Sequence, residues 1–132
     1  MRIPIAELID RMAILKLKIE RVGEPHLQKE YDKYNKAVLK FENEGIKIDK
    51  SWFDKLYKIN GKVWDIEFDL REIVNKLYNN ISVELNDEDL VEIGKKRLSV
   101  EKLSKKRNVI INQIVKQTGK GFKTIKLDYP DK

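Results

Sequence analysis

Hydrophobic residues recur every three or four positions along most of the chain, which is the spacing of amphipathic helices. Glycines, prolines and polar capping residues interrupt this spacing, and residues of these kinds mark the ends of helices. The pattern predicts helices at about residues 4–22, 27–44, 51–80 and 86–118, with Ser51 as the N-cap of the third. Because four helices with short connections favour an antiparallel bundle, the predicted fold class is all-α.

The third predicted helix carries the strongest signal in the sequence. Two apolar stripes run along it, and such a helix needs neighbours on both sides, so we expect it to be central. Gly61 lies within it, where glycine costs about 1 kcal/mol relative to alanine. We therefore expect a neighbouring helix to approach closely at Gly61. The first stripe comprises Trp52, Leu56, Ile59, Val63, Ile66, Leu70, Ile73 and Leu77, and the second comprises Phe53, Tyr57, Trp64, Val74 and Tyr78.

The fourth predicted helix interrupts its own apolar seam with Arg97, Ser104 and Arg107. An unpaired buried arginine is costly, so each arginine must meet a carboxylate, reach solvent or receive an anion. A small change in helix phase would place Leu103 and Ile110 in the seam and expose Arg97, whereas Arg107 stays inside in either phase. The seam rows are Ile93–Val100–Arg107–Ile114 and Leu90–Arg97–Ser104–Ile111, and the candidate carboxylate partners on the third helix are Asp65, Glu67 and Asp69.

The residues after the fourth predicted helix follow a different pattern. Apolar and charged residues alternate from Ile125 to Tyr129, which is the periodicity of a strand. A lone strand has no sheet to join in an all-helical chain, so we expect a short extended arm that packs across the bundle or pairs with a second copy. The predicted organisation is a helical bundle domain at 1–121 and a C-terminal arm at 122–132.

Charge is unevenly distributed along a chain whose 132 residues suit a single domain. The formal net charge is +6, but residues 94–126 alone hold 11 Lys or Arg side chains against the single acidic residue Glu101. A domain with one basic side has a field that draws anions to that side. A solvated, lysine-rich helix face is the competing interpretation.

Several kinds of chemistry are absent from the sequence. The chain has no cysteine, which excludes disulfides, thiolate metal sites and cysteine nucleophiles. His26 is the only histidine, so an ordinary zinc site or a Ser-His-Asp triad is not expected. Glycines at 119 and 121 flank Lys120 and could form a phosphate-binding nest, although a helix C-cap followed by a turn is the favoured interpretation.

Two acidic pairs raise the alternative of an enzyme. Asp69 with Glu72, and Asp89 with Glu92, each share a helix face, and magnesium-dependent nucleotide pyrophosphatases of all-helical fold use clustered carboxylates. Their motif is denser, with an adjacent Glu-Glu that this pattern lacks. We therefore predict no enzyme, no catalytic residue, no metal and no cofactor.

A family resemblance supports the helical prediction. The opening resembles that of a family of small all-helical proteins whose members occur in tailed phages and near bacterial surface-polysaccharide genes. The resemblance implies a helical domain and no particular reaction. It also implies a role beyond solubility for Arg11, Arg71, Arg97 and Arg107, because such arginines recur within the family's apolar frame. The residues that carry it are Ile3–Arg11, Ile14, Lys18 and Arg21, then Val63–Glu67 with Arg71, and finally Arg97, Lys106, Arg107 and Asn112.

From these patterns we predict a non-enzymatic protein that captures a small phosphorylated ligand, a nucleotide or a nucleotide signal, in a basic cleft. A phage counter-defence protein that sequesters such a ligand would be one form of it. Arginine forks recognise phosphate, and aromatic rings stack on bases. The predicted ligand-binding residues are Arg11, Lys18, Trp64, Arg71, Arg97, Ser104, Arg107, Lys120 and Lys123.

Two alternatives come from other classes of function. One is a nucleic-acid-binding protein that uses the basic fourth helix and the tail. Against it, the lysines of that helix are expected to circle it, and no helix-turn-helix signature is evident. The other is an assembly or adaptor protein whose tail mediates self-association, and we expect a homo-oligomer. With no apolar run of membrane-spanning length and no secretory signal at the start, we expect a cytoplasmic location, in the host if the chain is phage-encoded.

Overall fold

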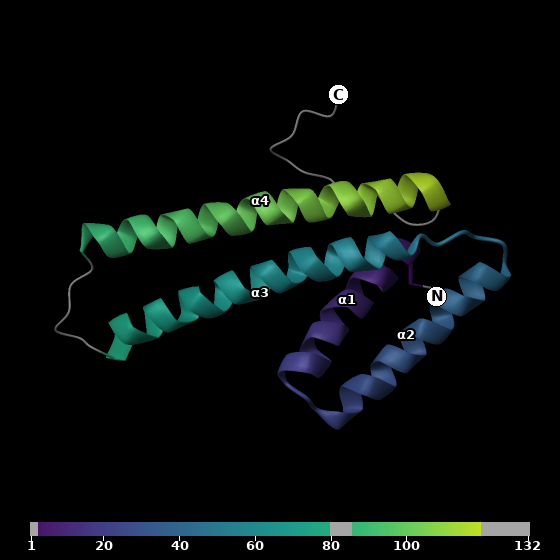
Figure 1. Cartoon of the computed structure of the whole chain (residues 1–132), viewed down its shortest axis with the longest axis horizontal. Helices are drawn as coiled ribbons and strands as arrows, with labels where there is room; N and C mark the ends of the chain where they lie inside the picture. Colours follow the sequence, from purple (N-terminus) through teal and green to yellow (C-terminus); the bar gives the residue numbers. More distant parts are fainter. Residues whose placement is uncertain (1–2, 80–85, 120–132) are drawn as a thin grey trace.

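The computed structural model describes residues 3–79 and 86–119, and within them it confirms an all-α antiparallel bundle. The two long helices α3 and α4 lie side by side and run in opposite directions, whereas α1 and α2 form a shorter pair beside the first half of α3 (Figure 1). The predicted arm, 122–132, lies outside the described residues. The helices are α1 (Ile5–Arg21), α2 (Pro25–Asn43), α3 (Lys50–Asn79) and α4 (Asp87–Thr118).

The helix ends follow local capping chemistry. The Asn86 side chain accepts a hydrogen bond from the Asp89 N–H at 2.8 Å, and Gly119 ends α4 with a positive φ of 66°. The predicted cap of α3 was wrong by two residues. Asp49 rather than Ser51 takes this role, because its carboxylate accepts the Ser51 N–H at 2.8 Å. That hydrogen bond also lowers the pKa of Asp49.

The core is organised around α1. Within the described part of the chain α1 contacts all three other helices, α3 contacts α1 and α4, and α2 contacts α1 alone. The central helix is therefore α1, and the prediction that α3 is central was wrong, because α3 has two neighbouring helices, no more than α4 has. A second row on α1, Ala6–Asp10–Ala13–Leu17, is buried beside the apolar one. This row explains how a helix of 17 residues packs against three neighbours.

Gly61 lies where α1 crosses α3, as its position within an apolar helix predicted. A Cβ atom built at Gly61 would lie 3.5 Å from Leu17 Cδ2 and 3.7 Å from Arg21 Nη2, both on α1. These separations are ordinary van der Waals contacts. The close approach is confirmed, and it still leaves room for one methyl group.

Gly61→Ala is accordingly expected to stabilise the fold by about 0.5–1 kcal/mol, because alanine restricts the unfolded chain and favours the helix. Gly94→Ala should give a similar gain, since no atom lies within 4 Å of the added Cβ. Gly45→Ala is the opposing control, because Gly45 has a φ of +91° that disfavours alanine. Thermal unfolding followed by circular dichroism measures all three. A destabilised Gly61→Ala would show that α1 and α3 cannot accommodate the methyl group.

Candidate functional site

Arg107, the arginine predicted to stay inside the bundle, is paired within the chain. Its guanidinium donates to both carboxylate oxygens of Asp10, with Nε 3.1 Å from Oδ1. Asn60 Nδ2 donates to the same Oδ1 at 3.0 Å. The carboxylate of Asp10 is nearly inaccessible, and its hydrogen bond with Arg107 raises the pKa of that guanidinium. This cluster joins α1, α3 and α4 at one buried point.

The identity of the carboxylate corrects the sequence interpretation. Asp65 and Asp69 of α3 were candidate partners of Arg107, but Asp65 accepts from Arg21 at 2.5 Å and Asp69 from Lys96 at 3.4 Å. Sequence reasoning missed Asp10 because it tracked only the stripe through Ile5 and Leu8. The signal was present, since Asp10 lies at helical spacing from two small residues of the same face, Ala6 and Ala13.

Arg97 does not share a cleft with Arg107. The shifted helix phase is the observed one, because Leu103 and Ile110 turn inward whereas Arg97 is exposed. The two arginines are ten residues apart, which is about 15 Å along a helix. With Arg107 paired to Asp10, the predicted basic cleft between the two arginines is not formed. That the chain captures a phosphorylated ligand stays a prediction. Arg97 and Arg107 together no longer form the central pair of cations for such a site.

The other predicted ligand-binding residues lie in different places. Arg11 pairs with Glu7 at 2.6 Å and donates to the Tyr34 hydroxyl at 3.5 Å, and these hydrogen bonds raise its pKa. Lys18 is exposed on α1. Lys120 and Lys123 lie outside the described residues. Neither Arg11 nor Lys18 therefore joins Arg107 in one site.

Trp64, Arg71, Arg97 and Ser104 belong instead to one face of the α3–α4 hairpin. Residues seven apart share a helix face, so Tyr57, Trp64, Arg71 and Tyr78 form one row on α3. The start of this row contacts α1: the Tyr57 hydroxyl donates to Glu20 at 2.6 Å, and the Arg21 guanidinium lies 5.5 Å from the Trp64 ring centre. Since α1 ends at Arg21, nothing of α1 covers the row beyond Trp64.

The row of α4 residues that lies beside this α3 row also becomes more exposed with increasing distance from α1. Ile111 belongs to the buried core with α1 residues, Ser104 is half-buried, Arg97 is exposed and Leu90 is 52% exposed. Tyr78, opposite on α3, is 77% exposed. We call this surface the distal hairpin face, and it comprises Trp64, Arg71 and Tyr78 of α3 with Leu90, Arg97 and Ser104 of α4.

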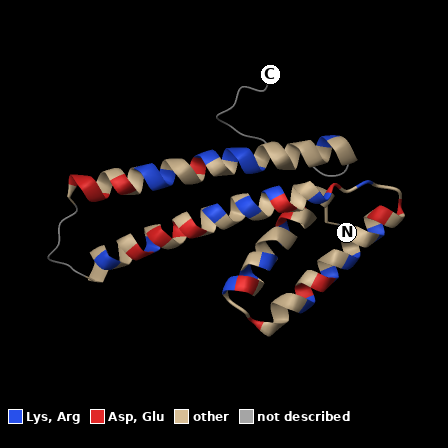
Figure 2. Cartoon of the chain, viewed as in Figure 1, with Lys and Arg blue, Asp and Glu red and all other residues tan. Residues whose placement is uncertain are grey.

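Lys and Arg residues are frequent along the middle of α4 (Figure 2), and the exposed lysines among them form a second surface. Lys95, Lys102, Lys106 and Lys116 are exposed and fall within about 80° of one another at 100° per residue. The expectation that the lysines circle the helix was therefore wrong. Lys96 is the exception, because its side chain is only 25% exposed and turns inward to Asp69. Nucleic-acid binding by this lysine face stays a prediction.

Metal ligation and similarity to known proteins add no further site. Within 3–79 and 86–119, no three His, Asp or Glu side chains are grouped to hold a metal ion, and no helix is long and apolar enough to cross a membrane. Comparisons with models of protein families, with curated proteins and with solved structures found no match. The family resemblance thus stays a prediction, and a functional conclusion depends on the geometry of the surfaces.

Proposed function

We propose that this chain is a non-enzymatic assembly protein whose distal hairpin face binds a second copy. The observation that carries the proposal is the uncovered end of the hairpin, which extends beyond α1 and α2 (Figure 1). Large apolar side chains are exposed there, including Phe68, Tyr78, Leu90 and Val91. Tyr78 and Leu90 lie on the distal hairpin face itself, and exposed apolar side chains with a polar rim are typical of protein interaction sites.

The half of the α3–α4 hairpin that α1 covers indicates which kind of partner would fit the distal hairpin face. There, an amphipathic helix, α1, packs across both long helices and supplies a carboxylate to an α4 arginine. Past Gly61, Leu70 is the only buried residue of α3, and α4 has none before Asn108. Two helices in contact along one seam cannot cover apolar residues on their other faces. Further helices packed on the distal half would bury them.

The charges on this face favour a second copy as the source of those helices. Arg71 and Arg97 lie one turn from Glu67 and Glu101, and within the described structure none of the four forms an ion pair. In a twofold-symmetric interface, each contact occurs twice: if one residue of the first copy contacts another residue of the second copy, the same two residues also make contact with the copies exchanged. A face with two cations and two anions can therefore complement itself when two copies pack antiparallel.

The test is a charge exchange followed by the mass in solution from light scattering. The unaltered chain is expected to form a dimer. Arg71→Glu with Arg97→Glu should weaken the dimer at least about tenfold, because like charges then face each other. Glu67→Arg with Glu101→Arg should do the same. Mixing these two variants is expected to restore the dimer mass, since each then meets opposite charges.

The matched control reverses two exposed charges on α2, by Lys33→Glu with Lys36→Glu, and should leave the dimer intact. A monomer mass for the unaltered chain at high concentration would refute the proposal. Dimers that persist in both hairpin variants would place the interface elsewhere. Circular dichroism of every variant verifies that the helices are retained.

A further inference from the structure

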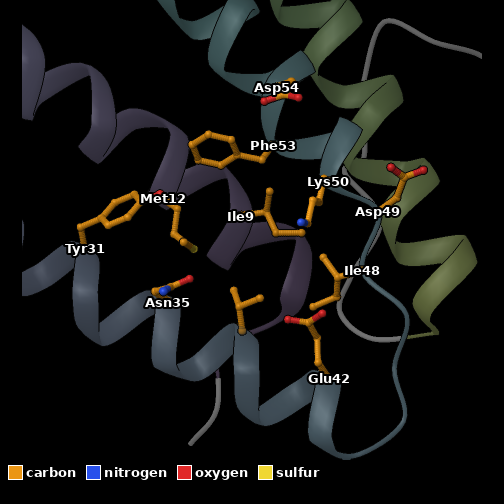
Figure 3. A pocket seen from close by; sticks show the side chains of 11 residues that line it. Ile9, Met12, Tyr31, Asn35, Glu42, Ile48, Asp49, Lys50, Phe53 and Asp54 are labelled. Carbon is orange, nitrogen blue, oxygen red and sulfur yellow. The ribbon is translucent and has the colours of Figure 1, made fainter.

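A cavity of about 330 Å³ lies between α1, α2 and the start of α3, away from the distal hairpin face (Figure 3). Its apolar lining is Ile9 and Met12 of α1, Val38 of α2, and Ile48 and Phe53 at the entry to α3. Ile9 and Met12 are part of the buried core, so the cavity reaches the interior from the surface. Its volume is in the range of small-ligand sites, about 300–1,000 Å³.

The polar groups around this cavity are mostly acidic. Glu42, Asp49 and Asp54 contribute three carboxylates, and Lys50 contributes the one ammonium group. Glu42 and Asp54 form no ion pair within the described structure, whereas Asp49 accepts the Ser51 N–H. The four lining charges sum to −2, and the Lys16 ammonium near Phe53 brings the sum to −1, so the rim still favours cations.

The aromatic side chains reinforce that preference. Phe53 and Tyr31 point into the cavity region from α3 and α2 in Figure 3. The Lys16 ammonium lies 5.9 Å from the Phe53 ring centre, which is within the range of a cation–π interaction. Carboxylates and aromatic faces together are the groups that recognise organic ammonium ions. The apolar floor would take the hydrocarbon part of such a ligand.

We propose that this cavity binds an organic ammonium ion with an apolar body, such as an arylalkylamine. The amine nitrogen would lie near Asp54 and the Phe53 ring, and the ring or chain would pack against Ile9 and Met12, whereas Glu42 stands at the opposite edge of the cavity in Figure 3. This site is independent of the distal hairpin face, and it would make the chain a receptor for a small cation as well as an assembly protein.

The test is an NMR titration of the isotope-labelled chain with phenethylamine and with 2-phenylethanol, which has the same ring and no charge. Phenethylamine is expected to bind with a dissociation constant of about 1 mM or tighter and to shift amides at 48–54. Asp54→Asn should weaken its binding roughly two- to fivefold, the range for exposed ion pairs, whereas Glu42→Gln, at the opposite edge, should have the smaller effect. Glu72→Gln, an exposed carboxylate on the distal part of α3, should leave it unchanged.

Salt gives a second measurement on the unaltered chain. Binding of phenethylamine should weaken as ionic strength rises, whereas that of 2-phenylethanol should not. Equal affinities for the two probes would overturn the proposal, because the cavity would then recognise only the ring. Amide shifts outside the cavity lining, or none with phenethylamine, would overturn it as well.

Discussion

Arg107→Met is expected to lower the free energy of unfolding by about 3–5 kcal/mol. The substitution keeps most of the side-chain volume but leaves the Asp10 carboxylate, on a side chain that is 7% exposed, with Asn60 as its remaining partner. A buried charge that loses its counter-ion costs several kcal/mol, which is far more than a surface ion pair contributes. Urea denaturation followed by circular dichroism measures the change.

The reciprocal variant distinguishes a buried charge from simple loss of packing. Asp10→Leu should cost less, about 2–4 kcal/mol, because the Arg107 side chain is 34% exposed and its guanidinium can turn toward water. The double variant Asp10→Leu with Arg107→Met should be more stable than Arg107→Met alone, since no unpaired charge is left. Lys36→Met, at an exposed cation on α2 away from the distal hairpin face, is the control and should change stability by less than about 0.5 kcal/mol. Additive losses in the double variant would contradict the buried pair.

Leu56→Ala is expected to destabilise the chain by about 3–5 kcal/mol. Leu56 is fully buried in the cluster where α1 and α4 meet α3, so removing its side chain loses apolar burial and leaves a cavity. Lys55→Ala, the exposed neighbour on the same helix, should change stability by less than about 0.5 kcal/mol. Thermal unfolding followed by circular dichroism compares them. A small loss at Leu56 would show that α3 does not depend on this cluster.

The self-association experiment and these stability measurements report on different parts of the hairpin. Asp10, Arg107 and Leu56 hold the end that α1 covers, whereas Arg71 and Arg97 lie on the end that it leaves bare. Core variants should therefore lower the unfolding free energy directly. Charge reversal on the distal hairpin face should change the mass in solution while leaving the helical content of the chain intact.

Much of the fold was predictable because helix formation depends on neighbours three and four residues apart. The approximate extents of the helices, the C-cap at Gly119 and the close approach at Gly61 all follow from such local patterns and are confirmed. The N-cap of α3 differs from the predicted one. Asp49 and Ser51 are both residue types that cap helices, and only the observed backbone shows that Asp49 takes this role. Local chemistry thus identified the helix and its approximate start.

The candidate site was less predictable, because it depends on which helices meet and how far each extends. The sequence by itself determined that Arg107 points inward, since both helix phases bury it. Only the tertiary structure decided that its carboxylate is Asp10, 97 positions away, because ion pairing depends on distance in space and carries no local signal. The bare face around Arg71 and Arg97 has the same origin: α1 is shorter than the hairpin it packs against, so it covers one end and leaves the other exposed.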